Sequence, residues 1–301
     1  MSVRLGNDES HIVLISNTGN ACRFKPSEIK MRRDNNTGEM VPHQVLKTYG
    51  RNTQPKVGMK LVKDVVDKEG KKTFDDQGEK ITQSMGHVVG MIVSDNEDTL
   101  VLTITKFGKA KRTKLGSGMM ISKLGYDESG NPIRNPETQE VETIRDGFAK
   151  ASGTGTQGSK AMGLRKEGVP AGVSSIKWLK EMTDKEKIAW HNNKFPGNQL
   201  KSVSKIEKMW PKDEIIRVHQ IPNDRDQIFL LAASGMIIRF KAYNEDKETR
   251  REVGKQASGN WVMRVRDKQN GGFSDQVISS ARLPAELIED ETPSTAENEE
   301  E

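Results

Sequence analysis

The sequence is poor in the residues that mark several common classes of protein. Cys22 is the one cysteine among 301 residues, so the chain has no disulfide framework and no cysteine-based metal site. Aromatic residues make up 5% and hydrophobic residues 33%, which argues against a helical bundle and concentrates the apolar residues in a few strands between long polar loops. No segment approaches the roughly 20 apolar residues of a membrane span, and the first residues lack the apolar core of a signal peptide. We therefore expect a soluble cytoplasmic protein with no membrane partner.

Charge is distributed unevenly along the chain. The formal net charge is +5, yet residues 285–301 hold eight acidic side chains and no lysine or arginine. A like-charged tail of this composition cannot bury apolar surface, so we expect it to be disordered. Residues 1–284 are therefore more basic than the net charge suggests, and we expect them to form the folded domain.

One short pattern occurs three times and organises the chain. Each copy is an aliphatic run, a turn that contains a glycine, and an arginine four residues after that glycine. Aliphatic runs bounded by turn residues are typical of buried strands, and a glycine between two of them predicts a hairpin turn with positive φ. The copies are residues 11–23, 99–112 and 227–239, with glycines Gly19, Gly108 and Gly235 and arginines Arg23, Arg112 and Arg239.

Each hairpin also has similar flanking segments. An apolar strand and an acidic or amide-rich turn stand before the second and third copies, at residues 87–98 and 213–226, whereas the first has only the stub 3–5. A glycine-punctuated segment and an alternating strand follow each copy, at residues 50–61, 168–179 and 254–265. Strand, hairpin, loop and strand repeated in this order predict the blades of a propeller. We expect blades near residues 3–62, 87–179 and 213–281.

The glycines of successive copies are 89 and 127 residues apart. We therefore expect insertions near residues 63–86 and 116–212, or very degenerate extra blades, with hairpins where apolar and charged residues alternate. One helix is expected after Thr183, because Thr183 and Glu186 form a capping box ahead of an apolar segment. The predicted fold class is all-β, with blades, inserted hairpins, one short helix and an acidic tail.

The repeated pattern, closed by the strand 275–281, resembles the blades of the C-terminal β-pinwheel of type IIA topoisomerase A subunits, as in DNA gyrase and topoisomerase IV. The resemblance implies a non-catalytic module that binds double-stranded DNA and works with a topoisomerase core, made of the A-subunit breakage-reunion domain and the B subunit. It also implies a place in the cytoplasm, associated with the nucleoid. None of Tyr49, Tyr126 and Tyr243 has the sequence context of the family's DNA-linking tyrosine, so we expect no catalytic residue and no enzyme activity of the chain itself.

Basic residues recur at matching places in the repeats, so they are expected to form a belt along one rim. Phosphate contacts carry no sequence information, so such a belt predicts binding that tolerates any DNA sequence. The candidate DNA-binding residues are Arg23, Lys25, Arg51, Lys56, Lys109, Lys111, Arg112, Lys114, Arg165, Lys166, Arg239, Lys241, Lys255 and Arg264. The gyrase hallmark Gln-Arg-Arg-Gly-Gly-Lys-Gly is absent, which favours bending over full wrapping. The acidic tail is expected to compete with DNA for the belt.

Other interpretations of the sequence stay open. A propeller-like scaffold that binds protein would use its charge only for solubility, and an enzyme site in the insertion 116–212 is a third alternative. The segment 153–158 fits a dinucleotide-binding pattern, but no apolar strand precedes it and no apolar helix follows it. The five histidines lack the spacing of metal ligands, so we expect neither a metal nor a cofactor.

Overall fold

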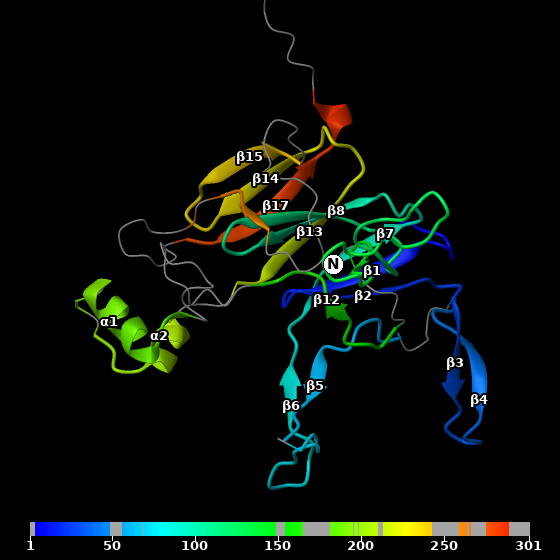
Figure 1. Ribbon diagram of the computed structural model, residues 1–301, viewed down its shortest axis with the longest axis horizontal. Helices are drawn as coiled ribbons and strands as arrows, with labels where there is room; N and C mark the ends of the chain where they lie inside the picture. Colours follow the sequence, from blue (N-terminus) through cyan, green and yellow to red (C-terminus); the bar gives the residue numbers. More distant parts are fainter. Residues whose placement is uncertain are drawn as a thin grey trace, which may run out of the picture.

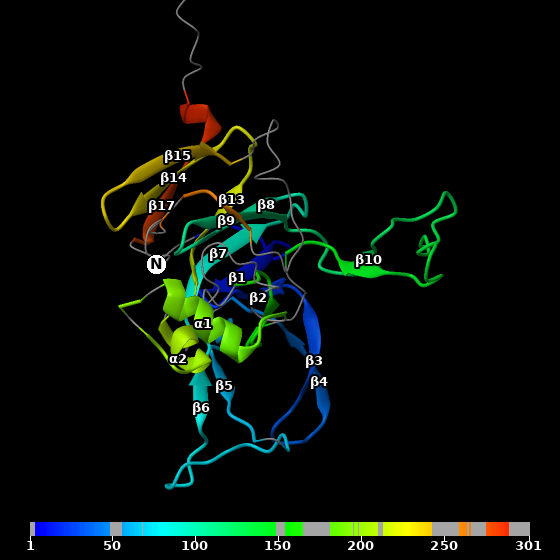
Figure 2. The same ribbon diagram turned by 60° about the vertical axis from the view of Figure 1, so that its left-hand side comes forward.

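The computed structural model describes residues 4–48, 56–67, 69–148, 154–164, 181–194, 196–197, 199–209, 213–242, 259–263, 265 and 275–288. Strands dominate this part of the chain, which confirms the predicted all-β class. Three sheets lie one above another, with two long hairpins extending below the lowest of them (Figure 1). A view turned by 60° shows a third arm that projects sideways and carries β10 (Met120–Ser122) (Figure 2).

The three predicted hairpins form the centre of the three sheets. They are β1 (His11–Ser16) with β2 (Asn20–Phe24), β8 (Leu100–Thr105) with β9 (Lys109–Lys114), and β14 (Gln227–Ala232) with β15 (Ile237–Lys241). Their turn glycines have φ values of +85°, +80° and +87°. Residues with a β-carbon rarely adopt this conformation, which explains the glycine at the same place in each copy.

The first two hairpins are flanked by strands from the repeat that follows them, whereas the sequence suggested strands from their own repeat; the third is flanked by a strand of its own repeat. The strand β7 (Val88–Ser94) pairs with β1, β13 (Ile215–Ile221) pairs with β8, and β17 (Val277–Leu283) pairs with β14. On the other side, β12 (Ser159–Lys160) pairs with β2, and β16 (Asn260–Trp261) pairs with β9. The first sheet is therefore β12-β2-β1-β7, the second is β13-β8-β9-β16, and the third is β15-β14-β17. The acidic turns predicted before the hairpins carry the chain from one sheet to the next.

Apolar side chains between the sheets form the core. One cluster joins the first sheet to the second through residues such as Val13, Ile15 and Met162. A second cluster joins the second sheet to the third, through residues such as Leu102 and Leu230. A third, smaller cluster lies on the other face of the first hairpin and contains Cys22, Phe24, Val45 and Met59.

Several segments form arms outside the three sheets: two hairpin arms lie near the expected insertions, whereas the arm at residues 29–44 lies within the expected first blade. Three arms are hairpins: β3 (Ile29–Arg33) with β4 (Met40–Gln44), β5 (Val62–Asp64) with β6 (Thr82–Ser84), and β10 with β11 (Thr143–Arg145). The predicted helix is α1 (Asp184–Lys194), and the capping box forms: Thr183 N donates to Glu186 Oε2 at 2.7 Å and Glu186 N donates to Thr183 Oγ1 at 3.4 Å.

Two features differ from the sequence-based expectation. A second helix, α2 (Val203–Met209), follows α1 and contacts it, although only one helix was predicted. The chain is also ordered past residue 285, because η3 (Ala285–Leu287) continues from β17 and Ala285 N donates to Asp226 Oδ1 at 3.0 Å. The rest of the predicted tail, 289–301, lies outside the described residues. In the part of the chain that is described, no helix is long and apolar enough to cross a membrane.

Candidate nucleic-acid interface

The predicted DNA-binding residues divide into a buried group, an exposed or partly exposed group, and a group outside the described residues. The buried group is Arg23, Lys109, Lys111 and Arg112. The second group is Lys25, Lys56, Lys114, Arg239 and Lys241. Arg51, Arg165, Lys166, Lys255 and Arg264 lie outside the described residues. The belt predicted from the repeats is therefore not one continuous solvent-facing row in the part that is described.

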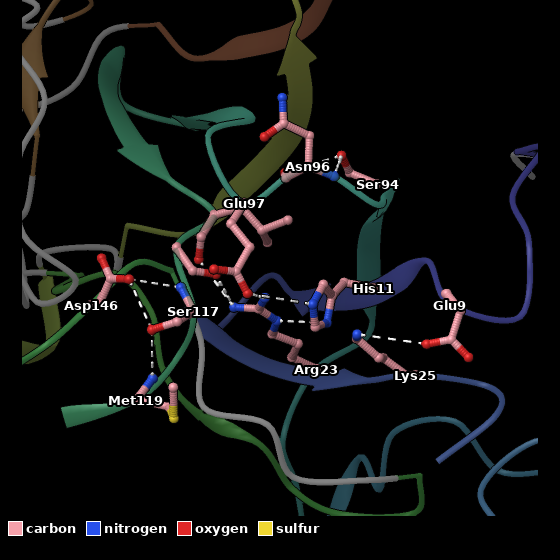
Figure 3. A network of polar contacts seen from close by, with 12 residues as sticks. Glu9, His11, Arg23, Lys25, Ser94, Asn96, Glu97, Ser117, Met119 and Asp146 are labelled. Carbon is pink, nitrogen blue, oxygen red and sulfur yellow. Dashed lines mark hydrogen bonds and ion pairs between the residues drawn. The ribbon is translucent and has the colours of Figure 1, made fainter.

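Arg23 holds the first sheet against the second. Its Nε donates to His11 Nδ1 at 3.1 Å, and its Nη1 donates to the carbonyl oxygens of Leu115 at 3.2 Å and Gly116 at 2.5 Å. Its Nη2 lies 3.7 Å from Glu97 Oε1, in the turn that leads into the second hairpin. Figure 3 shows the guanidinium between His11 and Glu97. Burial lowers the pKa of Arg23, and the nearby Glu97 and Asp146 carboxylates oppose that shift.

His11 is neutral in this network at neutral pH. Its Nε2 lies 3.8 Å from Glu97 Oε1, which would be an ion pair only if the ring were protonated. Burial, together with the charges of Arg23 and Lys25, lowers the pKa of His11 from 6.5 to about 4. The neutral ring is therefore the hydrogen-bond acceptor that Arg23 Nε requires.

The same contact is repeated between the second and third sheets. Arg112 is buried, and its Nη1 lies 3.6 Å from Asp224 Oδ1, in the turn that leads into the third hairpin. Asp224 follows Asn223 as Glu97 follows Asn96, so the two acids occupy matching places in their turns. In these two copies, the arginine four residues after the turn glycine thus joins neighbouring sheets, a role that its position in the sequence did not reveal.

The two buried lysines also have protein partners. Lys111 Nζ donates to the carbonyl oxygen of Ala161 at 2.6 Å, which ties the second hairpin to the segment after β12. Lys109 Nζ lies 4.6 Å from the centre of the Trp261 ring, in β16. Both lysines are buried, with 5% of the surface of Lys109 and 2% of that of Lys111 exposed, so neither faces solvent.

The exposed candidates differ in how far neighbouring acids neutralise them. Lys25 Nζ lies 3.8 Å from Glu9 Oε2 and Lys114 Nζ lies 2.5 Å from Asp98 Oδ1, so both lysines form ion pairs beside the hairpins. Arg239 and Lys241 are exposed on β15, and Arg239 Nε donates to Gln227 Oε1. Lys56 belongs to a different group, on the first blade.

A cluster of positive charge lies beside the β3–β4 arm, and we call it the first-blade cluster: Arg32, His43, Lys47 and Lys56. Lys56 Nζ donates to His43 Nε2 at 2.7 Å and to the carbonyl oxygen of Val45 at 2.5 Å. Partial burial and the charges of Arg32 and Lys47 lower the pKa of Lys56, and burial and the three cations lower that of His43. The part of each shift that comes from the neighbouring cations is a repulsion that a bound anion would relieve. The sequence indicated a cationic loop at 25–48 but not that Lys56 joins it.

A second concentration of cations surrounds a cavity of about 710 Å³ between β7, β13 and β17. Arg4, Arg217 and His219 are among its lining residues, together with Glu214. Glu214 is engaged by Lys106 Nζ at 3.1 Å and by Asn17 Nδ2 at 2.9 Å. Burial and the charges of Arg282, Arg217 and Arg4 lower the pKa of His219 to about 4. Among the described residues, no group of three or more His, Cys, Asp or Glu side chains could hold a metal ion.

Comparisons with known proteins bear on the central hairpin. Residues 99–117, which span β8 and β9, match the family described as DNA gyrase C-terminal domain, beta-propeller. The structure titled "Crystal structure of the C-terminal domain of DNA topoisomerase IV" is 13% identical, with a TM-score of 0.42, over 95% of this chain and 50% of that chain. "Structure of DNA gyrase A C-terminal domain" is 12% identical, with a TM-score of 0.19, over 91% of this chain and 100% of that chain.

The present chain thus spans half the length of the topoisomerase IV structure that it matches. No curated protein matches the sequence. The family match covers the β8–β9 hairpin, which is one copy of the repeating unit of the fold. This hairpin carries Arg112, which contacts the third sheet through Asp224. The predicted resemblance to the C-terminal, β-pinwheel-like domain of gyrase A is therefore confirmed, and it is carried by residues 99–117.

Proposed function

We propose that this domain binds double-stranded DNA without sequence preference and bends it, as a non-catalytic module of a type IIA topoisomerase A subunit. The match of residues 99–117 to the DNA gyrase C-terminal family supports the class of function. The first-blade cluster carries the proposal for this chain, because Arg32 and Lys47 lie close enough to Lys56 and His43 to help lower the pKa of both, and Lys56 Nζ lies 2.7 Å from His43 Nε2. A phosphate backbone supplies the negative charge that such a cluster lacks.

The arrangement of the sheets favours a curved path for the DNA. Arg239 and Lys241 are exposed on the third sheet, and the first-blade cluster lies beside the first sheet. A duplex that contacted both groups would cross the edge of the stacked sheets, so it would follow their outline. Smooth bending of a short duplex costs on the order of 1–6 kcal/mol, which several phosphate contacts can offset.

The proposed partner is the catalytic core of a topoisomerase, to which the domain would present the bent segment. The core would supply the breakage and rejoining of strands, while this chain supplies position and curvature. We place this activity in the cytoplasm, at the nucleoid. The alternative, a scaffold that binds only protein, predicts weak DNA binding with little dependence on salt.

The test is the affinity for a short duplex of arbitrary sequence, measured by fluorescence anisotropy over a range of salt concentrations. If the domain neutralises about 6–10 phosphates, affinity falls about 10³- to 10⁵-fold between 50 and 200 mM salt. The variant Arg32→Glu/Lys47→Glu/Lys56→Glu should bind more weakly and show a shallower salt slope. A flat salt dependence, or a triple variant that binds like the wild type, would contradict the proposal.

The matched control changes three exposed lysines on the β5–β6 arm, Lys63→Glu/Lys71→Glu/Lys80→Glu. These lysines lie among acidic residues, as in the pair between Lys71 and Glu69 at 3.1 Å, so we expect a smaller loss of affinity.

Bending is tested separately by the circularisation of short DNA fragments, and by the change in plasmid linking number when a relaxing enzyme acts in the presence of the domain. Removal of residues 289–301 should tighten binding at low salt if the acidic tail competes with DNA.

A further inference from the structure

One face of each hairpin has the same register in all three sheets, and we call it the arginine face. It contains two cross-strand pairs, of which one includes the repeated arginine. The pairs are Val13–Arg23 and Ile15–Ala21, Leu102–Arg112 and Ile104–Ala110, and Phe229–Arg239 and Leu231–Ile237. In the first two hairpins, every one of these side chains is buried, with at most 6% of its surface exposed.

The described residues cover the arginine face of the third hairpin only in part. Leu231 is 37% exposed and Ile237 is 66% exposed, although both are apolar and occupy places that are buried in the other two sheets. Arg239 is exposed as well, and it lies over the Phe229 ring at 5.7 Å from the ring centre. Large apolar side chains gathered on one sheet face are a mark of an interaction surface.

The opposite end of the stack has the complementary feature. Each interface between sheets contains an arginine face, the back face of the next hairpin and a buried methionine, which is Met162 in the first interface and Met263 in the second. The cluster below the first sheet contains the back face of the first hairpin, where Val45 and Met59 help to bury Cys22 and Phe24, while Ile12 and Leu14 of the same face are only partly buried. Among the described residues of this cluster there is no arginine face.

The polar groups that an incoming arginine needs are also present at that end. Arg23 binds the carbonyl oxygens of Leu115 and Gly116, and Gly116 N in turn donates to the carbonyl oxygen of Glu97 at 2.7 Å. The first repeat has the same turn, in which Ser27 N donates to the carbonyl oxygen of Asp8 at 3.0 Å. Asp8 therefore stands where Glu97 stands in the second repeat, and its side chain is exposed.

We propose that a second copy of this chain covers the exposed part of the third hairpin's arginine face, with Arg239 of one copy bound to Asp8 and to the neighbouring turn carbonyls of the next. The first and third sheets lie at opposite ends of the stack in both views, so one copy does not supply both halves of the contact (Figures 1 and 2). The contact is heterologous, because it joins different surfaces of the two copies, and it produces a ring or an open chain of domains. It needs no DNA, and it withdraws Arg239 from the cations proposed above to contact DNA, so that Lys241 is the candidate left on the third sheet.

The experiment measures the assembly of the full chain by sedimentation velocity without DNA, over a range of protein concentrations. The wild type should form species larger than the monomer, in proportions that rise with concentration. Arg239→Glu and Asp8→Arg should each weaken the assembly at least about tenfold, because each places like charges at a desolvated contact. Circular dichroism checks that both variants remain folded.

Mixing the two variants gives the sharper result. The Asp8→Arg variant keeps Arg239 and the Arg239→Glu variant keeps Asp8, so an equimolar mixture should regain the larger species that neither variant forms alone. Arg134→Glu, at an exposed arginine on the β10–β11 arm, is the matched control and should assemble like the wild type. A wild type that is monomeric at every concentration, an assembly that neither variant weakens, or a mixture that stays monomeric would overturn the proposal.

Discussion

Arg23 and Arg239 occupy the same place in two copies of one hairpin, but their surroundings differ. Each donates from Nε to the first residue of its partner strand, His11 in one case and Gln227 in the other. Arg23 also reaches the carbonyl oxygens of Leu115 and Gly116 beyond the next hairpin, whereas no further hairpin follows the third among the described residues and Arg239 is exposed. The comparison teaches that a repeated cation is a structural residue wherever another blade follows it.

The largest expected difference is in the free energy of unfolding when Arg23 or Arg239 is replaced by alanine. Arg23→Ala removes the side-chain donor of the buried Gly116 carbonyl oxygen and one of the two donors of the Leu115 carbonyl oxygen, so it should lower the free energy of unfolding by about 3 kcal/mol. Arg239→Ala should change it by less than about 0.5 kcal/mol, because the side chain is exposed. Chemical denaturation measured at low protein concentration, where the domain is monomeric, gives both values. Equal losses at the two sites would mean that the difference in burial does not govern their roles.

The second expected effect is a dependence of stability on pH, which comes from His11, the side chain that accepts the hydrogen bond of Arg23. The pKa of His11 is about 4 in the folded protein, below the ordinary histidine value of 6.5, so its neutral form stabilises the fold. This stability is complete above pH 6.5 and is lost as the pH falls towards 4, because the unfolded state then binds more protons; it amounts to at most about 3 kcal/mol. His219, whose pKa is also about 4, adds a loss over the same range.

The substitution His11→Gln gives the first hairpin the acceptor that the third already has. It should reduce the loss of stability between pH 7 and pH 4 while leaving the contribution of His219 in place. Denaturation curves of the wild type and the variant at several pH values measure the difference. An unchanged pH dependence would show that His11 is not the group whose protonation weakens the first interface.

The smallest expected difference lies in the turns. Both Gly108 and Gly235 have positive φ, so alanine at either site costs about 1–2 kcal/mol. A β-carbon at Gly108 would lie 2.3 Å from the carbonyl oxygen of Met263, whereas at Gly235 none of the described residues lies within 4 Å. Gly108→Ala should therefore destabilise the protein by about 1–3 kcal/mol more than Gly235→Ala, as overpacking does elsewhere. Thermal or chemical unfolding of the two variants would contradict this if their losses were the same.

Local features of the chain were predictable because they depend on neighbouring residues. The hairpins around Gly19, Gly108 and Gly235 follow from aliphatic runs and from the need for positive φ at the turn. The capping box at Thr183 forms as the sequence indicates. The helix α2 was not foreseen, because its seven residues carry no comparable start signal.

The candidate interface was predictable only in part. The repeated arginines were recognised, but their burial depends on carbonyl oxygens more than 90 residues away along the chain, as the contact of Arg23 with Gly116 shows. The first-blade cluster joins Lys56 to Arg32 across the β3–β4 arm, a proximity that spacing alone does not indicate. The exchange of strands between repeats was also hidden, because strand periodicity does not name the partner strand.

The sequence by itself determined where the hairpins form, where their turns bend and which repeats are equivalent, because backbone conformation and side-chain alternation are local properties. Only the tertiary structure decided which of the equivalent cations are enclosed between sheets and which face solvent. The physical reason is that burial of a guanidinium requires a neighbouring sheet with hydrogen-bond acceptors in place. Arg23 has such a sheet, whereas none of the described residues forms one over Arg239.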